Sequence, residues 1–486
     1  MLSLISRGLL LLAGLCCLFS GSQPQDPLEI DVDEHDHEHQ EHLPCQHISY
    51  SIIQLTFILY RKSGSWTEDA NILFSPVNII AASLMLSLGA KDNTHNQILQ
   101  GLKFNITEIP ETYIHSCLQQ LLHILHLPDH RPHLTIDSGL FTDKGLKLVD
   151  KFVNNIKEIY HTKTIAVNFK DTEKAQNQIN KYVETETQGK IVDLAKDLEE
   201  DTALALMNYI VFQGNGFDEV DVEHKLEADF HVSQNETVKV PMINRRGRFF
   251  LHREEELSSW VLVNHYMGDA TAFFILPDQG KMQKLEENLS QKHFINILKL
   301  VDIRTVNLYF PELYMSTTYD LKTILSTLGI TQIFSNEADL SGITQDVPLK
   351  LNKAFHRTVL TFNDEVKHTT RNSSLSKRGL SKVPVIRFNR PFIIIVKDEY
   401  TNVPLFIPLA NGLHASLCTY HIRISEDLDT RSDSVSPMTS VTPSENWVFT
   451  FSNENDLELV EGYIRMSSVS TTAERMAHHC PKKSLK

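Results

Sequence analysis

The residues best suited to metal chemistry gather near the N-terminus. His35, His37, His39 and His42 are interleaved with aspartate and glutamate. Clustered imidazoles and carboxylates can hold zinc or copper weakly. Their spacing lacks the HExxH register of a catalytic zinc helix, and such a polar, acidic stretch is typical of a solvated, disordered leader. We therefore predict no catalytic metal site and no cofactor.

Enzyme motifs are missing from the chain. It has no G-x-S-x-G nucleophile elbow and no phosphate-binding P-loop. Gly214-Asn215-Gly216 lacks the third glycine of a dinucleotide loop. Single serine, histidine and aspartate residues are common, but nothing groups them into a triad. The pattern indicates a protein that is not an enzyme.

The first 22 residues have the composition of a signal peptide. Arg7 supplies the positive end, residues 8–19 form an apolar run, and Ser20 to Ser22 are small enough for a cleavage site. The run is too short to span a bilayer. We therefore expect a protein secreted into the extracellular space, where N-x-S/T sequons become plausible surface glycosylation sites. The sequons begin at Asn105, Asn235, Asn288 and Asn372.

The number of cysteines and the net charge exclude further classes of protein. Of the six cysteines, Cys45, Cys117, Cys418 and Cys480 lie beyond the predicted signal peptide, so no dense disulfide framework is implied. A bridge between Cys418 and Cys480 is possible, since both lie in the same tail. The net charge of −15 over 486 residues repels phosphate, so nucleic acid and anionic membranes are not expected partners.

Predicted helices and strands follow one another along the chain without a regular alternation. After a leader over residues 23–45, residues 46–407 mix helical and strand patterns and predict an α+β domain. Residues 408–486 are rich in Ser, Thr, Asp and Glu and predict an atypical, largely disordered tail. The helices are expected at 52–60, 78–88, 149–160 and 175–183, and the strands at 260–264, 270–276, 306–310, 359–362 and 392–396.

Several long segments together resemble the serpins, and within them the α-1-antitrypsin group. They are NILFSPVNIIAASLMLSLGAKDNTHNQILQGLKFN from Asn71, NYIVF from Asn208, FFILPD from Phe273, LGITQIFSNEADLSGIT from Leu328, FNRPF from Phe388 and PLFI from Pro404. The resemblance covers roughly residues 46–407. It implies three β-sheets, eight or nine helices, an exposed reactive-centre loop and a monomer. It also implies that Ser75, Asn208 and His356 match a buried polar cluster beneath the sheet that the loop enters.

The resemblance places the reactive-centre loop between the strand expected at 359–362 and the FNRPF segment, and the interval from His356 to Asn389 has the family's length. Counting along it puts the scissile bond at Leu380-Ser381, which suits a chymotrypsin-like or elastase-like serine protease. Arg378 offers a trypsin-like alternative. After cleavage, the loop of an inhibitory member inserts into the largest sheet as a new strand.

The start of this loop, its hinge, departs from the inhibitory pattern. Inhibitory members carry a Glu-Glu-Gly-Thr-like start and then small residues. Here the third and fourth positions are Val366 and Lys367. Side chains alternate along a strand, and the family pattern turns the face of Lys367 and Arg371 into the core. Burying an unpaired charge costs several kcal/mol, so we predict weakened inhibition. The hinge comprises Asp364, Glu365, Val366, Lys367, His368, Thr369, Thr370 and Arg371.

Two other readings stay open. The chain could be a non-inhibitory carrier of a small hydrophobic ligand, as some relatives are, although no residue set identifies a pocket. It could also be a folding-impaired duplicate, because PLANGLHASL replaces the usual ending after PLFI. Pro408 cannot donate a ladder hydrogen bond. Either the tail supplies a substitute strand or the last hairpin is damaged.

Overall fold

The computed structural model describes most of the globular part of the chain. The described residues are 45–64, 71–104, 108–127, 133–215, 224–233, 235–267, 269–299, 302–363, 383–410, 419–425, 448–450 and 472–476. All of them lie in one of two compact units, Pro44–Lys486. The other unit, Met1–Leu43, holds the predicted signal peptide and His35, His37, His39 and His42, which therefore lie outside the described residues. Among the described helices, none is long and apolar enough to cross a membrane.

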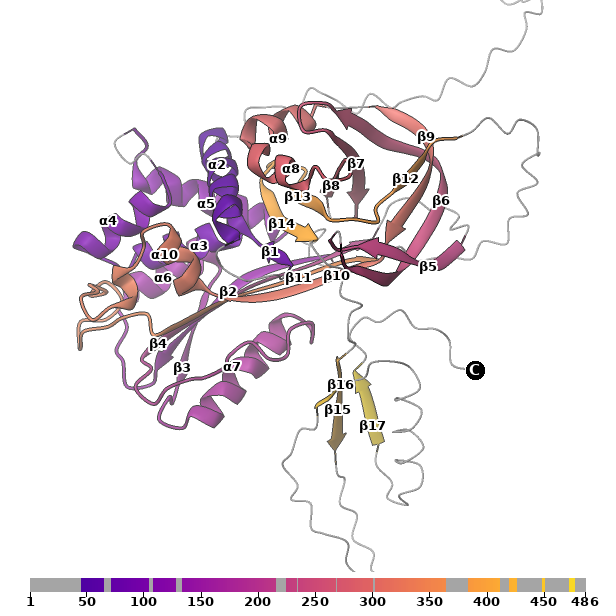
Figure 1. The fold of residues 1–486 in the computed structure, drawn as a ribbon. Helices are drawn as coiled ribbons and strands as arrows, with labels where there is room; N and C mark the ends of the chain where they lie inside the picture. The colour runs from indigo at the N-terminus through magenta and orange to yellow at the C-terminus, as the bar shows by residue number, and fades with distance from the viewer. Residues whose placement is uncertain are drawn as a thin grey trace, which may run out of the picture. The chain divides into compact units, whose positions relative to one another are not determined.

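A five-stranded sheet contains the strands that carry the candidate site (Figure 1). Its central strand, Leu204–Asn215, is buried on both faces almost throughout, so its sequence reads as an apolar run without alternation. Sequence periodicity therefore missed the strand that carries Asn208, although its NYIVF segment was singled out. In spatial order the strands are β10 (Leu313–Asp320), β11 (Lys353–Asn363), β4 (Leu204–Asn215), β2 (Leu134–Asp143) and β3 (Lys163–Val167).

The second large sheet has nine strands. Its strand β6 (Thr237–Glu254) pairs with β5 (His224–His231) at its start, with β9 (Ile303–Pro311) along its middle and with β7 (Ser259–Tyr266) at its end. Two of the three sheets implied by the resemblance are therefore continuous through β6. The order is β1 (Ile72–Phe74), β14 (Pro404–Ala410), β13 (Phe392–Asp398), β8 (Ala270–Pro277), β7 (Ser259–Tyr266), β6, β9 (Ile303–Pro311) and β12 (Val385–Arg387), with β5 (His224–His231) on β6.

Helices cover both faces of the five-stranded sheet. On one face, Ile179 and Val183 of α7 pack with Tyr209 and Val211 of β4. On the other face lies α3, which is buried all round and belongs to the main core. The mixed architecture confirms the predicted α+β class. The helices are α2 (Gln46–Ser63), α3 (Pro76–Ser87), α4 (Asp92–Gly101), α5 (Glu111–Leu125), α6 (Asp150–Tyr160), α7 (Thr172–Glu186), α8 (Met282–Asn288), α9 (Gln291–Ile297), α10 (Leu321–Thr327) and the 3-10 turn η2 (Gln332–Phe334).

The sequence of α3 explains why the helix begins where it does. The side chain of Ser75 caps it by accepting a hydrogen bond from the backbone N–H of Asn78, and Pro76 occupies the first turn. Both residues are favoured at those positions.

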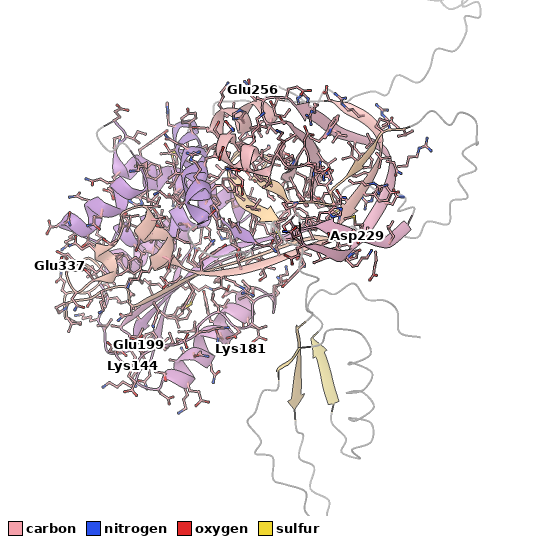
Figure 2. The ribbon with its side chains drawn as sticks, in the orientation of Figure 1. Lys144, Lys181, Glu199, Asp229, Glu256 and Glu337 are labelled. Atoms are coloured by element: carbon pink, nitrogen blue, oxygen red, sulfur yellow. A yellow bond between two sulfur atoms is a disulfide. The ribbon has the colours of Figure 1, made fainter. Side chains whose placement is uncertain are left out.

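Charged side chains project from the surface of the domain, as Lys181, Glu256 and Glu337 do in Figure 2.

The last hairpin is formed, and the first residues of the predicted tail supply the end of its second strand. Strand β14 runs to Ala410, three residues past the expected boundary at 407, and is buried along its length. It lies between β1 and β13. Its pairs with β13 lie on either side of Pro408, at Leu409 and Phe406, while Pro408 is paired with Leu73 of β1. A proline without an N–H is tolerated because the ladder continues on both sides of it.

After Ala410 the structure describes three short strands, and the rest of the predicted tail lies outside the described residues. A three-stranded sheet has the order β16 (Val448–Thr450), β15 (Thr419–Ser425) and β17 (Thr472–Met476). Cys418 and Cys480 lie outside the described residues, so their pairing stays a prediction.

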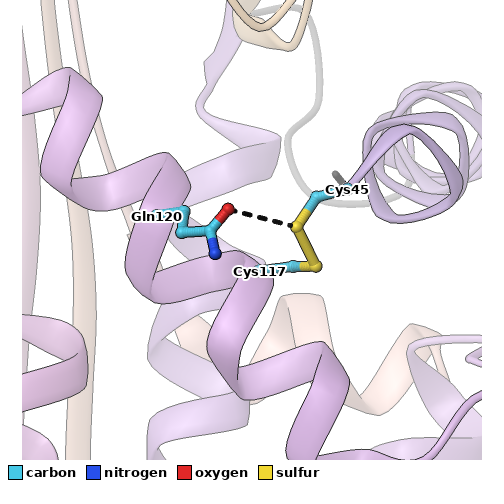
Figure 3. Close-up of a disulfide and its surroundings, with 3 residues drawn as sticks. All are labelled: Cys45, Cys117 and Gln120. Atoms are coloured by element: carbon cyan, nitrogen blue, oxygen red, sulfur yellow. Dashed lines mark hydrogen bonds between the residues drawn. A yellow bond between two sulfur atoms is a disulfide. The ribbon is translucent and has the colours of Figure 1, made fainter. Parts of the chain in front are cut away.

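The structure contains a disulfide that sequence reasoning missed. Cys45 bonds to Cys117, which joins the start of α2 to α5 (Figure 3). Cys45 is the last residue of the expected leader and directly precedes α2, which begins at Gln46. The two cysteines are 72 residues apart, and neither stands in a motif that signals its partner.

Candidate functional site

The predicted reactive loop connects the two large sheets. Strand β11 of the five-stranded sheet ends at Asn363, and the described chain resumes at Val383, just before β12 of the nine-stranded sheet. The loop between them is residues 364–382. The hinge Asp364–Arg371, Arg378, Leu380 and Ser381 all lie outside the described residues. The structure therefore gives the two anchors of the loop.

A seam runs through the centre of the five-stranded sheet. Strands β11 and β4 pair in parallel over their whole length, from Lys353 opposite Ala205 to Asn363 opposite Asn215. The outer neighbours of this pair, β10 and β2, are both antiparallel to it. A strand that followed β11 and folded back between β11 and β4 would be antiparallel to both. Antiparallel pairing is slightly more stable per residue than parallel pairing, so the hydrogen-bonding pattern alone would favour a strand placed there.

The two seam strands are joined from beneath by buried polar side chains. His356 of β11 bonds through Nδ1 to Oδ1 of Asn208 on β4, at 2.5 Å. Its Nε2 accepts a hydrogen bond from the backbone N–H of Ser75, at 3.0 Å. Asn208 in turn donates to the carbonyl oxygen of Asn78 and to Oγ of Ser138. The structure thus brings together the three residues predicted from sequence and adds Asn78 and Ser138. We call these five residues the seam cluster.

The hydrogen bonds define the protonation state of His356. Because Nε2 accepts from Ser75, the single ring proton is on Nδ1, where it is donated to Asn208. The side chain is fully buried, and burial lowers the pKa of His356 to about 3. The ring is therefore neutral at physiological pH. A neutral ring whose two nitrogens are both engaged stabilises the closed seam and does not act as a general base.

Besides this cluster, the core-facing side of the seam carries the buried hydroxyl of Thr358 on β11, which donates to the carbonyl oxygen of Leu73, and apolar side chains. Phe362 of β11 and Phe212 of β4 are buried there, and their rings lie 6.2 Å apart. Phe212 also contacts Phe406 of β14. Any strand that inserted at this level would present alternate side chains to aromatic rings.

A second buried network lies beside the seam cluster. Tyr160 of α6 bonds to Nδ1 of His115, and Nε2 of His115 and of His95 both bond to Oε1 of Glu111. These contacts lower the pKa of Glu111, mainly through the hydrogen bond from His115. Tyr160 also lines a cavity of about 10 Å³ whose wall includes Asn78 and Ser138. Sequence reasoning gave no sign of this network, because its residues come from α4, α5 and α6.

Two of the four predicted glycosylation sites lie among the described residues. Asn235 and Asn288 are exposed, as acceptor sites for glycans must be, while Asn105 and Asn372 lie outside the described residues. Within the described residues, no group of three His, Cys, Asp or Glu side chains could hold a metal ion.

A five-stranded sheet with a parallel central pair, and a buried polar cluster beneath that pair, match what the resemblance to the serpins implies. The family model described as "Serpin (serine protease inhibitor)" matches residues 51–409. The chain belongs to the serpin family.

Its relatives lie in the α-1-antitrypsin group. The chain is 50% identical over 408 residues to human alpha-1-antitrypsin-related protein, covering 83% of this chain and 97% of the relative. It is 49% identical to alpha-1-antiproteinase of Callosciurus caniceps, over 83% of this chain and 98% of the relative.

Solved structures show the same fold. Human thyroxine-binding globulin matches with a TM-score of 0.68 and 32% identity, over 76% of this chain and 98% of that structure. Human glycosylated kallistatin matches with a TM-score of 0.68 and 37% identity, over 75% and 97%.

Proposed function

We propose that this protein is a secreted serpin whose loop, residues 364–382, is bait for a serine endopeptidase. The observation that carries the proposal is the position of the loop anchors: β11 forms one side of the parallel seam, and the loop begins at its end. The proposed scissile bond is Leu380-Ser381, with cleavage after Arg378 as the alternative. The target is a chymotrypsin-like, elastase-like or trypsin-like enzyme.

Insertion requires β11 and β4 to separate. Their direct hydrogen bonds and the His356–Asn208 contact must break, and two new antiparallel ladders must replace them. The fate of the protease depends on how fast this happens, because the acyl-enzyme hydrolyses in competition with insertion.

The hinge makes insertion slow. Lys367 and Arg371 would enter the core-facing side of the seam, where Phe212 and Phe362 offer no counter-charge. Each unpaired charge buried there costs several kcal/mol. We therefore expect most encounters to end in a cleaved loop and a released protease, with covalent complex as the minor product.

Secretion is supported by the N-terminal sequence and by the disulfide. Cys45–Cys117 is a bond typical of oxidising compartments. The exposed sequons at Asn235 and Asn288 fit the same compartment.

The test is a gel of covalent complexes. The secreted chain is mixed separately with chymotrypsin, neutrophil elastase and trypsin, and a band resistant to SDS is sought at the summed mass. We expect cleavage within residues 364–382 with a minor complex band. A loop that no serine protease attacks would overturn the proposal.

A carrier role is the second candidate, favoured by the similarity to a solved structure of human thyroxine-binding globulin with its hormone. Saturable binding of a steroid or thyroid-type ligand would support it. A panel of such ligands without saturable binding would count against it.

A further inference from the structure

Three exposed arginines share one face of the nine-stranded sheet. Arg246 and Arg248 lie on β6 and are separated by one residue, so their side chains point to the same side. Arg246 is opposite Asn307 of β9, and Asn307 is opposite Val385 of β12. The third arginine, Arg387, is therefore two strands from Arg246 on the same face. We call these three residues the arginine face.

The positive charge of this face is not neutralised within the described part of the chain. None of the ion pairs found there involves Arg246, Arg248 or Arg387, and all three side chains are exposed. The guanidinium carbon of Arg387 lies 3.8 Å from the centre of the Tyr309 ring. This cation–π contact places the guanidinium group over the Tyr309 ring.

Two exposed apolar side chains lie next to the arginines. Phe250 of β6 and Ile303 of β9 are paired in register, and they are 39% and 48% exposed. Beyond them, the Asp302 carboxylate is already bonded to His252 and Arg304. Exposed aromatic and aliphatic side chains next to arginines are the composition of a protein-binding surface.

The face is also contiguous in sequence with the loop. From Val366 to Lys397 the chain holds eight Lys or Arg residues and no Asp or Glu, although its net charge is −15. β12, which carries Arg387, begins three residues after the loop ends at residue 382. The proposed scissile bond Leu380-Ser381 is only four residues from β12, so a protease that cleaves it is joined to the strand of Arg387 by a short length of chain.

We propose that the arginine face contacts an acidic rim around the active site of the attacking protease. This inference rests on the proposed function and specifies the partner: a serine protease whose surface next to its cleft carries carboxylates. Arginine suits this role because its guanidinium binds carboxylates in a bidentate fork. Complementary charge at such a site accelerates association by roughly 10- to 1000-fold at low salt and loses its effect as salt rises.

The test compares anionic with cationic trypsin. The two enzymes share their specificity for Lys and Arg, which the loop offers at Lys377 and Arg378. The second-order rate of cleavage within residues 364–382 is measured on the full secreted chain, between 20 and about 300 mM NaCl. The variant is Arg246→Glu with Arg248→Glu. The matched control is Lys151→Glu with Lys157→Glu, which changes net charge equally at exposed positions of α6.

We expect anionic trypsin to cleave the natural chain faster than cationic trypsin does at low salt. The Arg246/Arg248 variant should lose about tenfold in rate toward anionic trypsin, gain toward cationic trypsin and lose its salt dependence. The α6 control should keep nearly the natural cleavage rates with both trypsins and the natural salt dependence. A neutral pair, Arg246→Gln with Arg248→Gln, should change the rates in the same direction by a smaller factor, and equal thermal midpoints would show that each variant is folded.

The outcomes separate this inference from the function on which it rests. Equal rates for the Arg246/Arg248 variant and the α6 control would overturn the arginine face while leaving the bait loop intact. A loop that neither enzyme cleaves in any variant would overturn the proposed function and, with it, this inference. Heparin binding that needs the arginines, together with unchanged cleavage rates, would assign the face to a sulfated polysaccharide and also overturn the proposal.

Discussion

Acid should loosen the seam through a single side chain, His356. Burial lowers its pKa from 6.5 to about 3 in the folded chain, while the unfolded chain keeps the ordinary value. Between these two values the unfolded state binds more protons than the folded state. The stability contributed by a neutral His356 is therefore complete above pH 6.5 and is lost progressively as the pH falls toward 3.

The size of the effect follows from the two pKa values. At pH 5.0 the histidine is protonated in the unfolded chain and neutral in the folded chain. This pH lies roughly 1.5 units below the unfolded pKa of 6.5, and the loss accumulates over that interval. At about 1.36 kcal/mol per unit, the free energy of unfolding falls by about 2 kcal/mol relative to pH 7.5. His356 faces Asn208, the Ser75 backbone and apolar residues, so no carboxylate of the seam cluster offsets this loss.

The assay is urea unfolding at pH 7.5 and pH 5.0 for the natural chain and for His356→Gln, which cannot titrate. The variant should be less stable at pH 7.5 but should lose about 2 kcal/mol less on acidification. His47→Gln, at an exposed position on α2, serves as the control and should retain the acid sensitivity. If His356→Gln lost as much stability as the natural chain, the linkage to the seam cluster would be wrong.

Three further substitutions test the packing around the site. Replacing Cys117 by serine opens a link across 72 residues and should lower the free energy of unfolding by up to about 4 kcal/mol, and dithiothreitol should reproduce the loss in the natural chain. Gly342→Ala places a Cβ 2.7 Å from the carbonyl oxygen of Gly89 and should cost about 1–3 kcal/mol, whereas Gly64→Ala meets nothing within 4 Å and should change little in the same urea titration. Tyr160→Phe removes the bond to His115 and should cost about 1–2 kcal/mol in the unfolding free energy, so an unchanged midpoint would exclude that hydrogen bond.

Local sequence signals predicted part of this fold well. Residues 392–396 and 270–276 are short runs rich in β-formers, and both are strands in the structure, β13 and β8. The helix expected at 78–88 is α3, shifted by two residues at its start because Ser75 and Pro76 set the cap. These features depend on neighbours in the chain.

Features that depend on distant partners escaped prediction. The seam between β4 and β11 joins residues about 148 positions apart, as His356 and Asn208 show. Ser138 and Asn78 join the seam cluster only because β2 and α3 pack against β4. The Cys45–Cys117 bond and the arginine face also arise from elements far apart in sequence. The three seam residues that were predicted came from resemblance, which supplies such long-range pairing in advance.

The central claim is that a poor hinge turns a bait loop into a substrate, and hinge repair tests it most directly. Lys367→Thr combined with Arg371→Ala removes both charges from the face expected to enter the seam. The measurement is the fraction of reacted protease trapped as SDS-stable complex with chymotrypsin, for the natural and repaired chains side by side. Relief of several kcal/mol of charge burial predicts a shift from mainly cleaved loop to mainly complex. A natural chain that already traps the enzyme quantitatively, or a repaired chain that traps no more than the natural one, would contradict it.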